Sequence, residues 1–249
     1  DAKTLKDLMQ VQLGFGLNIK WLNPDEYSDI VPGIWKEGLQ GSTYSPEDGS
    51  CSSLLVSAAY FEHCKEEGVD FHFQEHITGF NIVSSKITKV ITDKGIYSSA
   101  KVVNAAGSYA REVGQMANLD LPVFPENHEA GITEPVERFF GPMVIDMRVA
   151  PGSSNFYFYQ NSEGQVVFCI TPEPPISGID TRSTSLFLPM CSKRMLTIYP
   201  RLRYLKVRRT WRGQYPMTPD GFPVVGIMDE AENLINAVGM CGQGFMLGP

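Results

Sequence analysis

Two stretches decide the fold of this chain: RTWRGQYPMTPDGFPVVG, at residues 209–226, and NLINAVGMCGQGFMLGP, at residues 233–249. The TPDG tetrapeptide is a turn signal, and the apolar residues that follow it predict short strands. Glycines at 239, 242 and 244 then form a glycine-rich loop. Because glycine has no Cβ, the loop can adopt positive φ and bring backbone N–H groups close to a ligand. This sequence of turn, apolar residues and glycines predicts a strand that ends in a ligand-binding loop.

A second block, VVNAAGSYA at residues 102–110, reads as a buried strand that runs directly into a turn of small residues. Ser108 then starts a helix. Small residues at 105–107 would let the backbone approach a nucleotide. A tight strand-to-helix turn that needs glycine only for its φ angle explains the same residues, so the block alone leaves both interpretations open.

Composition and charge exclude several classes of function. The 249 residues are 43% apolar and 20% charged, and the net charge of −7 argues against nucleic acid or an anionic membrane as the main partner. No apolar run is long enough to span a bilayer. The five cysteines show no CxxC spacing and the four histidines no HExxH pattern. We therefore expect reduced thiols, a cytoplasmic protein and no metal site.

The predicted elements fall into three parts, at residues 1–41, at 42–117 together with 209–249, and at 118–208. The first part is helical, with Pro24 at the first position of a short helix. The second mixes helices and strands, and the third is rich in strands that are separated by turn signals. The fold class is therefore α/β (α+β), with two interleaved domains, because a β-rich insert interrupts the mixed one.

Two individual elements are predicted from weaker patterns. A strand is expected from Val69 to Gln74 and on to Ile77. An amphipathic helix is expected over residues 183–199, although Pro189 lies early in it.

The two glycine-containing blocks together resemble the D-amino-acid oxidase-like family, which includes glycine oxidase, sarcosine oxidases and dehydrogenases, and related bacterial amine dehydrogenases. The resemblance implies a FAD-binding domain at 42–117 and 209–249, interrupted by a substrate domain at 118–208. It also implies hydride transfer from the carbon beside an amine to FAD. We expect the flavin to be non-covalent, since no cysteine lies between Trp211 and Gly226.

The GxGxxG fingerprint with which FAD domains of this type normally begin is absent from the sequence. Gly14-Phe15-Gly16 lacks the third glycine, and residues 239–244 have the spacing GxxGxG. The resemblance therefore implies an internal fragment of a longer enzyme. We expect the chain by itself to bind FAD weakly or not at all and to be inactive.

The resemblance places one set of residues against FAD. The backbone of 105–107 would contact its adenine or pyrophosphate side, and Ile77 would contribute through its backbone beside the adenosine. The glycine-rich loop would supply backbone donors near the pyrimidine edge of the flavin, where negative charge develops on reduction. The full set is Ile77, Ala105, Ala106, Gly107, Trp211, Gly213, Gly242, Gln243, Gly244, Phe245 and Met246.

Three residues are candidates for the substrate side. Arg212 could bind a substrate carboxylate with its permanently charged guanidinium, or form a structural ion pair. Tyr215 stands where glycine oxidase-like members carry the carboxylate-binding arginine, and its hydroxyl gives a hydrogen bond with less charge assistance. His128 could face the flavin from the start of the insert's first strand, or be a structural histidine. Arg148 and Tyr157 are further candidates.

The predicted function is oxidation of the C–N bond of a small amino acid or N-methyl amino acid, by a dehydrogenase rather than an oxidase. Relatives of this type often pass electrons to partner subunits, so such partners are expected beside the small-molecule amine. One alternative is a non-catalytic regulatory or scaffold protein that keeps the flavoprotein fold. Another is a flavoprotein that oxidises a glycerol phosphate-like alcohol. The arginines at 208, 209 and 212 are compatible with this alternative, because basic residues near the flavin would support it.

Overall fold

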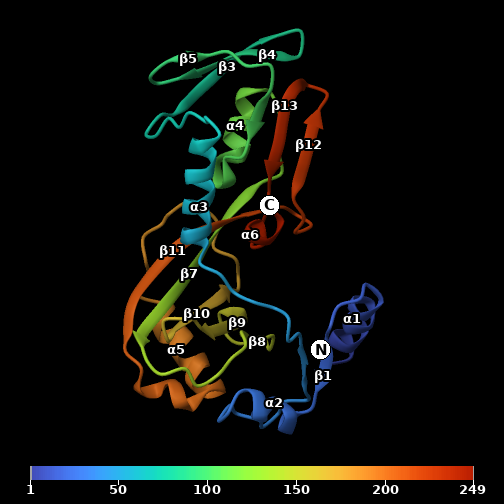
Figure 1. Ribbon diagram of the computed structural model, residues 1–249, viewed down its shortest axis with the longest axis vertical. Helices are drawn as coiled ribbons and strands as arrows, with labels where there is room; N and C mark the ends of the chain where they lie inside the picture. Colours follow the sequence, from blue (N-terminus) through green and yellow to red (C-terminus); the bar gives the residue numbers. More distant parts are fainter. Residues whose placement is uncertain (1, 249) are drawn as a thin grey trace. The chain divides into compact units, whose positions relative to one another are not determined.

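The computed structural model describes residues Ala2 to Gly248, which form two compact units (Figure 1). The first comprises Asp1–Cys51, His128–Pro175 and Arg182–Arg212, and the second comprises Ser52–Asn127, Ile176–Thr181 and Gly213–Pro249. Each unit is assembled from three separate stretches, so the two are interleaved. Asp1 and Pro249, which end two of the predicted ranges, lie outside the described residues.

A five-stranded sheet organises the first unit, in the order β11-β7-β10-β9-β8. Its strands are β7 (Phe124–Pro135), β8 (Val144–Asp146), β9 (Ser153–Gln160), β10 (Gln165–Pro172) and β11 (Val207–Met217). β10 pairs antiparallel with β7 and with β9, and β9 pairs antiparallel with β8. The antiparallel sheet predicted for the insert is therefore confirmed.

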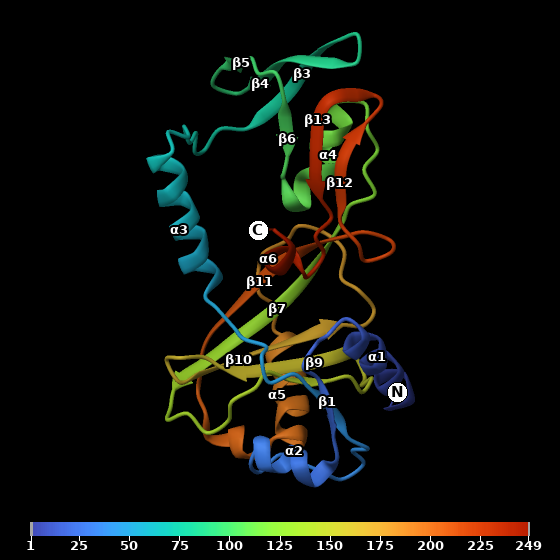
Figure 2. The ribbon, with the colours of Figure 1, turned by 45° about the vertical axis from the view of Figure 1, so that its right-hand side comes forward.

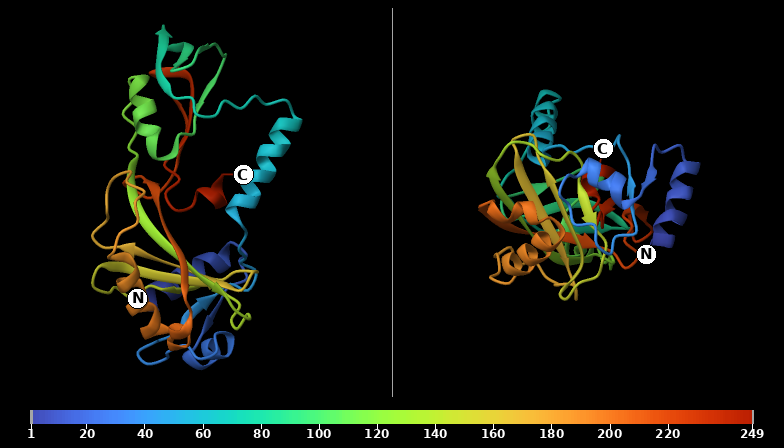
Figure 3. Two further views of the ribbon diagram at one scale, coloured as in Figure 1. Left: turned by 90° about the vertical axis from the view of Figure 1, so that its left-hand side faces the viewer. Right: turned by 90° about the horizontal axis from the view of Figure 1, so that it is seen from below.

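The sheet of the first unit has two different faces. Along β9, Phe156 and Phe158 are fully buried, while Asn155, Tyr157 and Tyr159 are half-buried. The buried face packs against α5 (Phe187–Ile198), which lies across β9 and β10 (Figures 2 and 3). The core between them also contains Val144, Val166, Phe168, Ile170, Phe187, Met195, Ile198 and Tyr199. The opposite face carries the two half-buried tyrosines.

The helix α5 is shorter than the predicted 183–199. Because it begins at Phe187, Pro189 is its third residue. The backbone N–H groups of a first helical turn have no partner within the helix, so a proline there removes no hydrogen bond. A 3₁₀-helix, η2 (Pro200–Tyr204), connects α5 to β11.

The N-terminal part of the first unit contains α1 (Ala2–Gly14), β1 (Lys20–Leu22), α2 (Pro24–Ile30) and β2 (Ser42–Tyr44). A capping box starts α2, because Oδ1 of Asn23 accepts from the backbone N–H of Glu26 and the Glu26 carboxylate accepts from that of Asn23. Pro24 is the first helical residue, as predicted. β1 and β2 pair antiparallel, whereas the sequence suggested helix alone.

Two three-stranded sheets form the second unit. One has the order β12 (Val224–Met228), β13 (Ala231–Val238), β6 (Val102–Asn104), with β13 antiparallel to β12 and parallel to β6 (Figure 2). The other contains β3 (Ile77–Val83), β4 (Lys86–Thr92) and β5 (Ile96–Tyr97). The helices are α3 (Ser53–Glu66), the 3₁₀-helix η1 (Gly107–Tyr109), α4 (Ala110–Met116) and α6 (Gly244–Leu247). The core contains Ile87, Ala110, Ala117, Leu119, Leu121, Leu234 and Val238.

The strand predicted over residues 69–77 is wrong except for its last residue. Residues 69–76 are irregular, and β3 begins at Ile77. Gln74 has a φ of 54°, which an extended strand does not allow. Phe71 and Phe73 both pack against Phe61 of α3, so their side chains do not serve a sheet face.

Candidate functional site

The glycine-rich loop follows β13 directly. Gly239 has a φ of 69°, and a Cβ there would lie 2.4 Å from Cγ2 of Thr218 in the TPDG turn. Cys241 adopts a φ of 51° and its backbone N–H donates to the carbonyl oxygen of Pro216. The loop is therefore tied to the turn before β12. Position 239 requires glycine for two reasons: its φ angle is positive, and Thr218 leaves no space for a Cβ.

Tyr215 lies against the same loop. A Cβ at Gly242 would lie 2.9 Å from Cε2 of Tyr215, so a larger residue would displace the tyrosine ring. Within residues 2–248, the backbone N–H groups of Gly242, Gly244 and Phe245 have no recorded acceptor. These three donors, held in a loop that needs glycine, are the group most suited to receive an electron-rich ligand edge. Gln243 directly precedes α6 and Met246 lies within it, and both are exposed.

The turn after β6 has a different requirement for glycine. Gly107 has a φ of 55°, but no atom lies within 4 Å of a Cβ placed there. The backbone N–H of Ala106 donates to Oδ1 of Asn104 at 3.2 Å, and Tyr109 N–H donates to the carbonyl oxygen of Ala106. We call Ala105–Gly107 the dinucleotide turn. Open space beside its glycine is compatible with close approach of a ligand.

The parallel pairing of β6 and β13 brings the two sequence blocks together. Asn104 is in register with Asn236, so both strands end at the same edge of the sheet. The dinucleotide turn begins one residue after β6, and the glycine-rich loop begins directly after Val238. Ligands of open α/β sheets bind outside the carboxyl ends of the strands. Ile77, in contrast, opens the other sheet of this unit, where it pairs with Thr92.

The predicted residues of β11 fall in both units. Trp211 and Arg212 belong to the first unit, and Gly213 and Tyr215 to the second. The Arg209 guanidinium lies 5.3 Å from the centre of the Trp211 ring, and Nη1 of Arg212 donates to the carbonyl oxygen of Arg182. No atom lies within 4 Å of a Cβ at Gly213. Arg212 thus makes a structural hydrogen bond to a backbone carbonyl, and the ion pair of the alternative interpretation stays a prediction.

His128 lies in the middle of β7, which begins at Phe124, so the prediction that it starts this strand is wrong. It is 8% exposed, and burial lowers its pKa from the ordinary 6.5 to about 4. The imidazole is therefore neutral at physiological pH. Ala130, two residues on, pairs with Cys169, which in turn pairs with Tyr157. His128 and Tyr157 consequently belong to the sheet face opposite α5.

Sequence reasoning missed three polar residues of this face. Tyr159 lies two residues beyond Tyr157 on β9, and Asn155 two residues before it. Oγ1 of Thr171 donates to Oδ1 of Asn155 at 2.9 Å. The alternation of aromatic and polar residues along β9 was the available signal, but it does not tell which face is covered by the helix.

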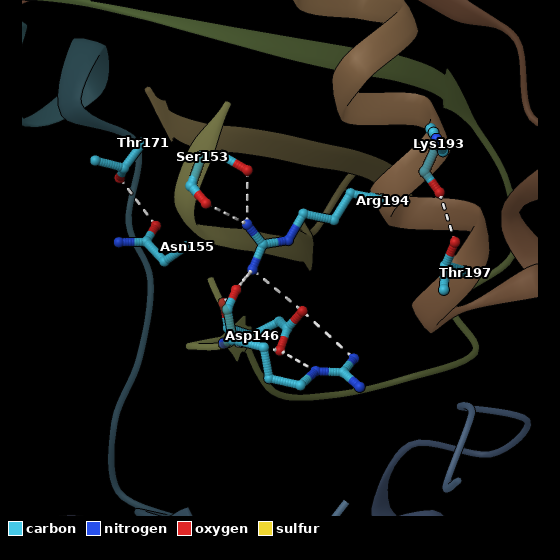
Figure 4. A network of polar contacts seen from close by, with 8 residues as sticks. Asp146, Ser153, Asn155, Thr171, Lys193, Arg194 and Thr197 are labelled. Carbon is cyan, nitrogen blue, oxygen red and sulfur yellow. Dashed lines mark hydrogen bonds and ion pairs between the residues drawn. The ribbon is translucent and has the colours of Figure 1, made fainter. Parts of the chain in front are cut away.

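Arg148 is held by a buried carboxylate. Nε of Arg148 lies 2.8 Å from Oδ1 of Asp146, while Nη2 of Arg194 lies 3.2 Å from Oδ2 (Figure 4). Arg194 also donates to Oγ of Ser153 at 2.7 Å and to the carbonyl oxygen of Arg148. The 8% exposed Arg194 thereby ties α5 to the β8–β9 connection. Arg148 is part of this network, so it is a weaker candidate for a substrate carboxylate than the sequence suggested.

Residues 2–248 contain neither a metal-binding cluster nor a membrane-spanning helix. No group of three or more histidine, cysteine, aspartate or glutamate side chains in that range is arranged to hold a metal ion. Nor does any helix there combine the length and apolar content needed to cross a bilayer.

Comparisons with known proteins give a consistent result. The family model "FAD dependent oxidoreductase" (DAO) matches residues 1–249. Hydrogen cyanide synthase subunit HcnC of Pseudomonas protegens is 26% identical over 89% of this chain and 51% of that protein. Glycine oxidase of Geobacillus kaustophilus is 25% identical over 95% of this chain and 60% of that enzyme. The chain thus spans about half the length of the curated relatives it matches.

Solved structures share the whole described fold. L-Proline dehydrogenase from P. horikoshii superposes with a TM-score of 0.92 at 31% identity, over 100% of this chain and 66% of that one. Glycine oxidase from Bacillus cereus superposes with a TM-score of 0.86 at 22% identity, which shows the fold alone.

Proposed function

This chain belongs to the DAO family of FAD-dependent oxidoreductases, and we propose that it acts as part of a longer flavoprotein that oxidises the C–N bond of a small amino acid or N-methyl amino acid. One observation carries the proposal. The parallel β6–β13 pair places the dinucleotide turn and the glycine-rich loop at one sheet edge, as a dinucleotide site requires.

The residues present fit FAD. The free N–H groups of Gly242, Gly244 and Phe245 would donate to the edge of the flavin ring on which negative charge develops. The dinucleotide turn offers backbone that a nucleotide can approach. Ile77, Trp211, Gly213, Gln243 and Met246 complete the proposed set. When bound, FAD supplies the hydride acceptor, and these residues orient it.

Tyr215 is our first choice for recognition of the substrate. Its ring lies against Gly242, where a side chain larger than hydrogen would collide with it. A neutral hydroxyl can donate one hydrogen bond to a carboxylate. Arg212 would add charge, and His128, neutral because of its burial, would offer a hydrogen bond without repelling a cationic amine.

Partner subunits are part of the proposal. Two relatives are named as subunits, HcnC of hydrogen cyanide synthase and the β subunit of an Arthrobacter sarcosine oxidase. We infer that the whole protein passes electrons to such a partner, as a dehydrogenase. The five free cysteines favour a cytoplasmic location.

The test is the visible spectrum of the full-length protein, titrated without oxygen against sarcosine, proline, hydroxyproline and D-amino acids. Bleaching of a bound flavin by one of them supports amine oxidation and identifies the substrate class. If glycerol 3-phosphate, added as a further titrant, is the only compound that bleaches the flavin, the substrate is an alcohol and not an amine. A full-length protein without flavin would refute it and favour the regulatory alternative.

A further inference from the structure

Two buried asparagines face each other across the parallel strands β6 and β13. Asn104 is 2% exposed and Asn236 is fully buried, and the two are partners in the strand register. Nδ2 of Asn104 donates to Oδ1 of Asn236 at 3.3 Å and to the carbonyl oxygen of Ala110 at 3.0 Å. Oδ1 of Asn104 accepts from the N–H of Ala106. One side chain therefore bonds both the dinucleotide turn, at Ala106, and the first residue of α4, Ala110.

The network fixes the orientation of both amides. Oδ1 of Asn104 must face the Ala106 N–H, so Nδ2 of Asn104 must face Asn236. Oδ1 of Asn236 must in turn face that donor, because a flipped amide would place two donors together. Nδ2 of Asn236 is then left without an acceptor among residues 2–248.

Stability does not explain this pair. The neighbours of Asn236 on the same face of β13 are Leu234 and Val238, both buried in the apolar core. An aliphatic residue would pack there without leaving a buried amide N–H group unpaired, which is unfavourable. What the pair achieves is a fixed amide on Asn104, and through it a fixed dinucleotide turn.

We propose that Asn104, held by Asn236, is a positioning residue for the nucleotide end of FAD. A turn that is already ordered in the free protein saves the ordering cost that binding would otherwise pay. The inference rests on the proposed function, because it assumes that the dinucleotide turn contacts FAD.

The test measures the FAD dissociation constant of the full-length apoprotein by flavin fluorescence, together with its melting temperature. Asn104→Ala removes the acceptor of the Ala106 N–H and is expected to weaken FAD binding about tenfold, the effect of one hydrogen bond. Asn104→Ser keeps an oxygen that can accept the N–H two residues on and should recover most of that affinity.

Asn233→Ala is the matched control. Asn233 lies on β13, three residues before Asn236, and its amide bonds both backbone groups of Ile87 and the carbonyl oxygen of Ala100, none of which belongs to the dinucleotide turn. It should lower the melting temperature and leave the FAD dissociation constant unchanged. Equal loss of FAD affinity in Asn104→Ala and Asn233→Ala would overturn the inference, because both would then act through stability.

Asn236→Leu tests the second half of the pair and does not depend on the folding of Asn104→Ala. It removes the unpaired N–H and fills the core, so the apoprotein should be at least as stable as wild type. FAD binding should nevertheless weaken about threefold, because the Asn104 amide is released. Unchanged FAD affinity in this variant would overturn the role of Asn236. A wild-type protein that binds no FAD would refute the proposed function itself.

Discussion

Substitution of alanine for Gly239 should destabilise the chain mainly through lack of space. Gly239 and Gly221 have similar φ angles, 69° and 76°, and both lie in the second unit. A Cβ at Gly239 would lie 2.4 Å from Cγ2 of Thr218, whereas a Cβ at Gly221 meets nothing within 4 Å. The two glycines therefore form a matched pair that separates steric from conformational cost.

The expected magnitudes follow from that difference. Alanine in the left-handed region costs about 1–2 kcal/mol, which both variants share. Forcing a methyl group into packed space adds about 1–3 kcal/mol at Gly239. We therefore expect Gly221→Ala to lower the free energy of unfolding by about 1–2 kcal/mol and Gly239→Ala by about 2–5 kcal/mol.

Urea denaturation of the 249-residue chain, followed by circular dichroism, measures both values. The dependence on urea should be unchanged, so that the shift in midpoint reports stability. If the two variants lose the same stability, the contact between Gly239 and Thr218 does not constrain the loop, and the reasoning is refuted.

Three further predictions concern charge, protonation and cofactor. Asp146→Ala should lower the free energy of unfolding by about 3 kcal/mol, because it leaves the buried Arg194 without its carboxylate. Asp7→Ala, which breaks an exposed pair with Lys3, should lower it by less than about 1 kcal/mol. Equal losses of stability in urea denaturation would contradict this prediction. Burial lowers the pKa of His128 to about 4, so between pH 6.5 and 4 the unfolded chain binds a proton that the folded chain does not. The free energy of unfolding should therefore decrease as the pH is lowered through that window. His128→Gln should make this decrease smaller. The chain alone should bind FAD at least about 100-fold more weakly than the full-length protein; tight stoichiometric binding in a fluorescence titration would contradict this.

Much of the fold could be predicted because local signals and topology agree. The turn residues of the insert predicted its strands, the family resemblance implied their antiparallel sheet, and Pro24 marked the start of α2. The failures arise where side-chain packing overrides local propensity. Residues 69–76 look like a strand, but Phe71 and Phe73 pack on α3 and the chain bends at Gln74.

The candidate site shows the same division between local and distant information. The glycine-rich loop could be recognised from its residues, and so could the small residues of the dinucleotide turn. The contact of Tyr215 with Gly242 could not, because it depends on how β11 passes the loop. His128 was placed at the start of its strand, but β7 begins four residues earlier, at Phe124.

The pairing of the two buried asparagines could not be predicted from the sequence. An amide between Leu234 and Val238, in a strand whose alternate positions are apolar, is a visible anomaly of the sequence. Its partner is 132 residues away and is set only by the parallel register of β6 and β13. A polar residue at a core position therefore predicts that a partner exists, and the strand register decides which residue it is. That register is also what brings the two glycine-containing blocks to one edge, so the same pairing would order the turn and assemble the site.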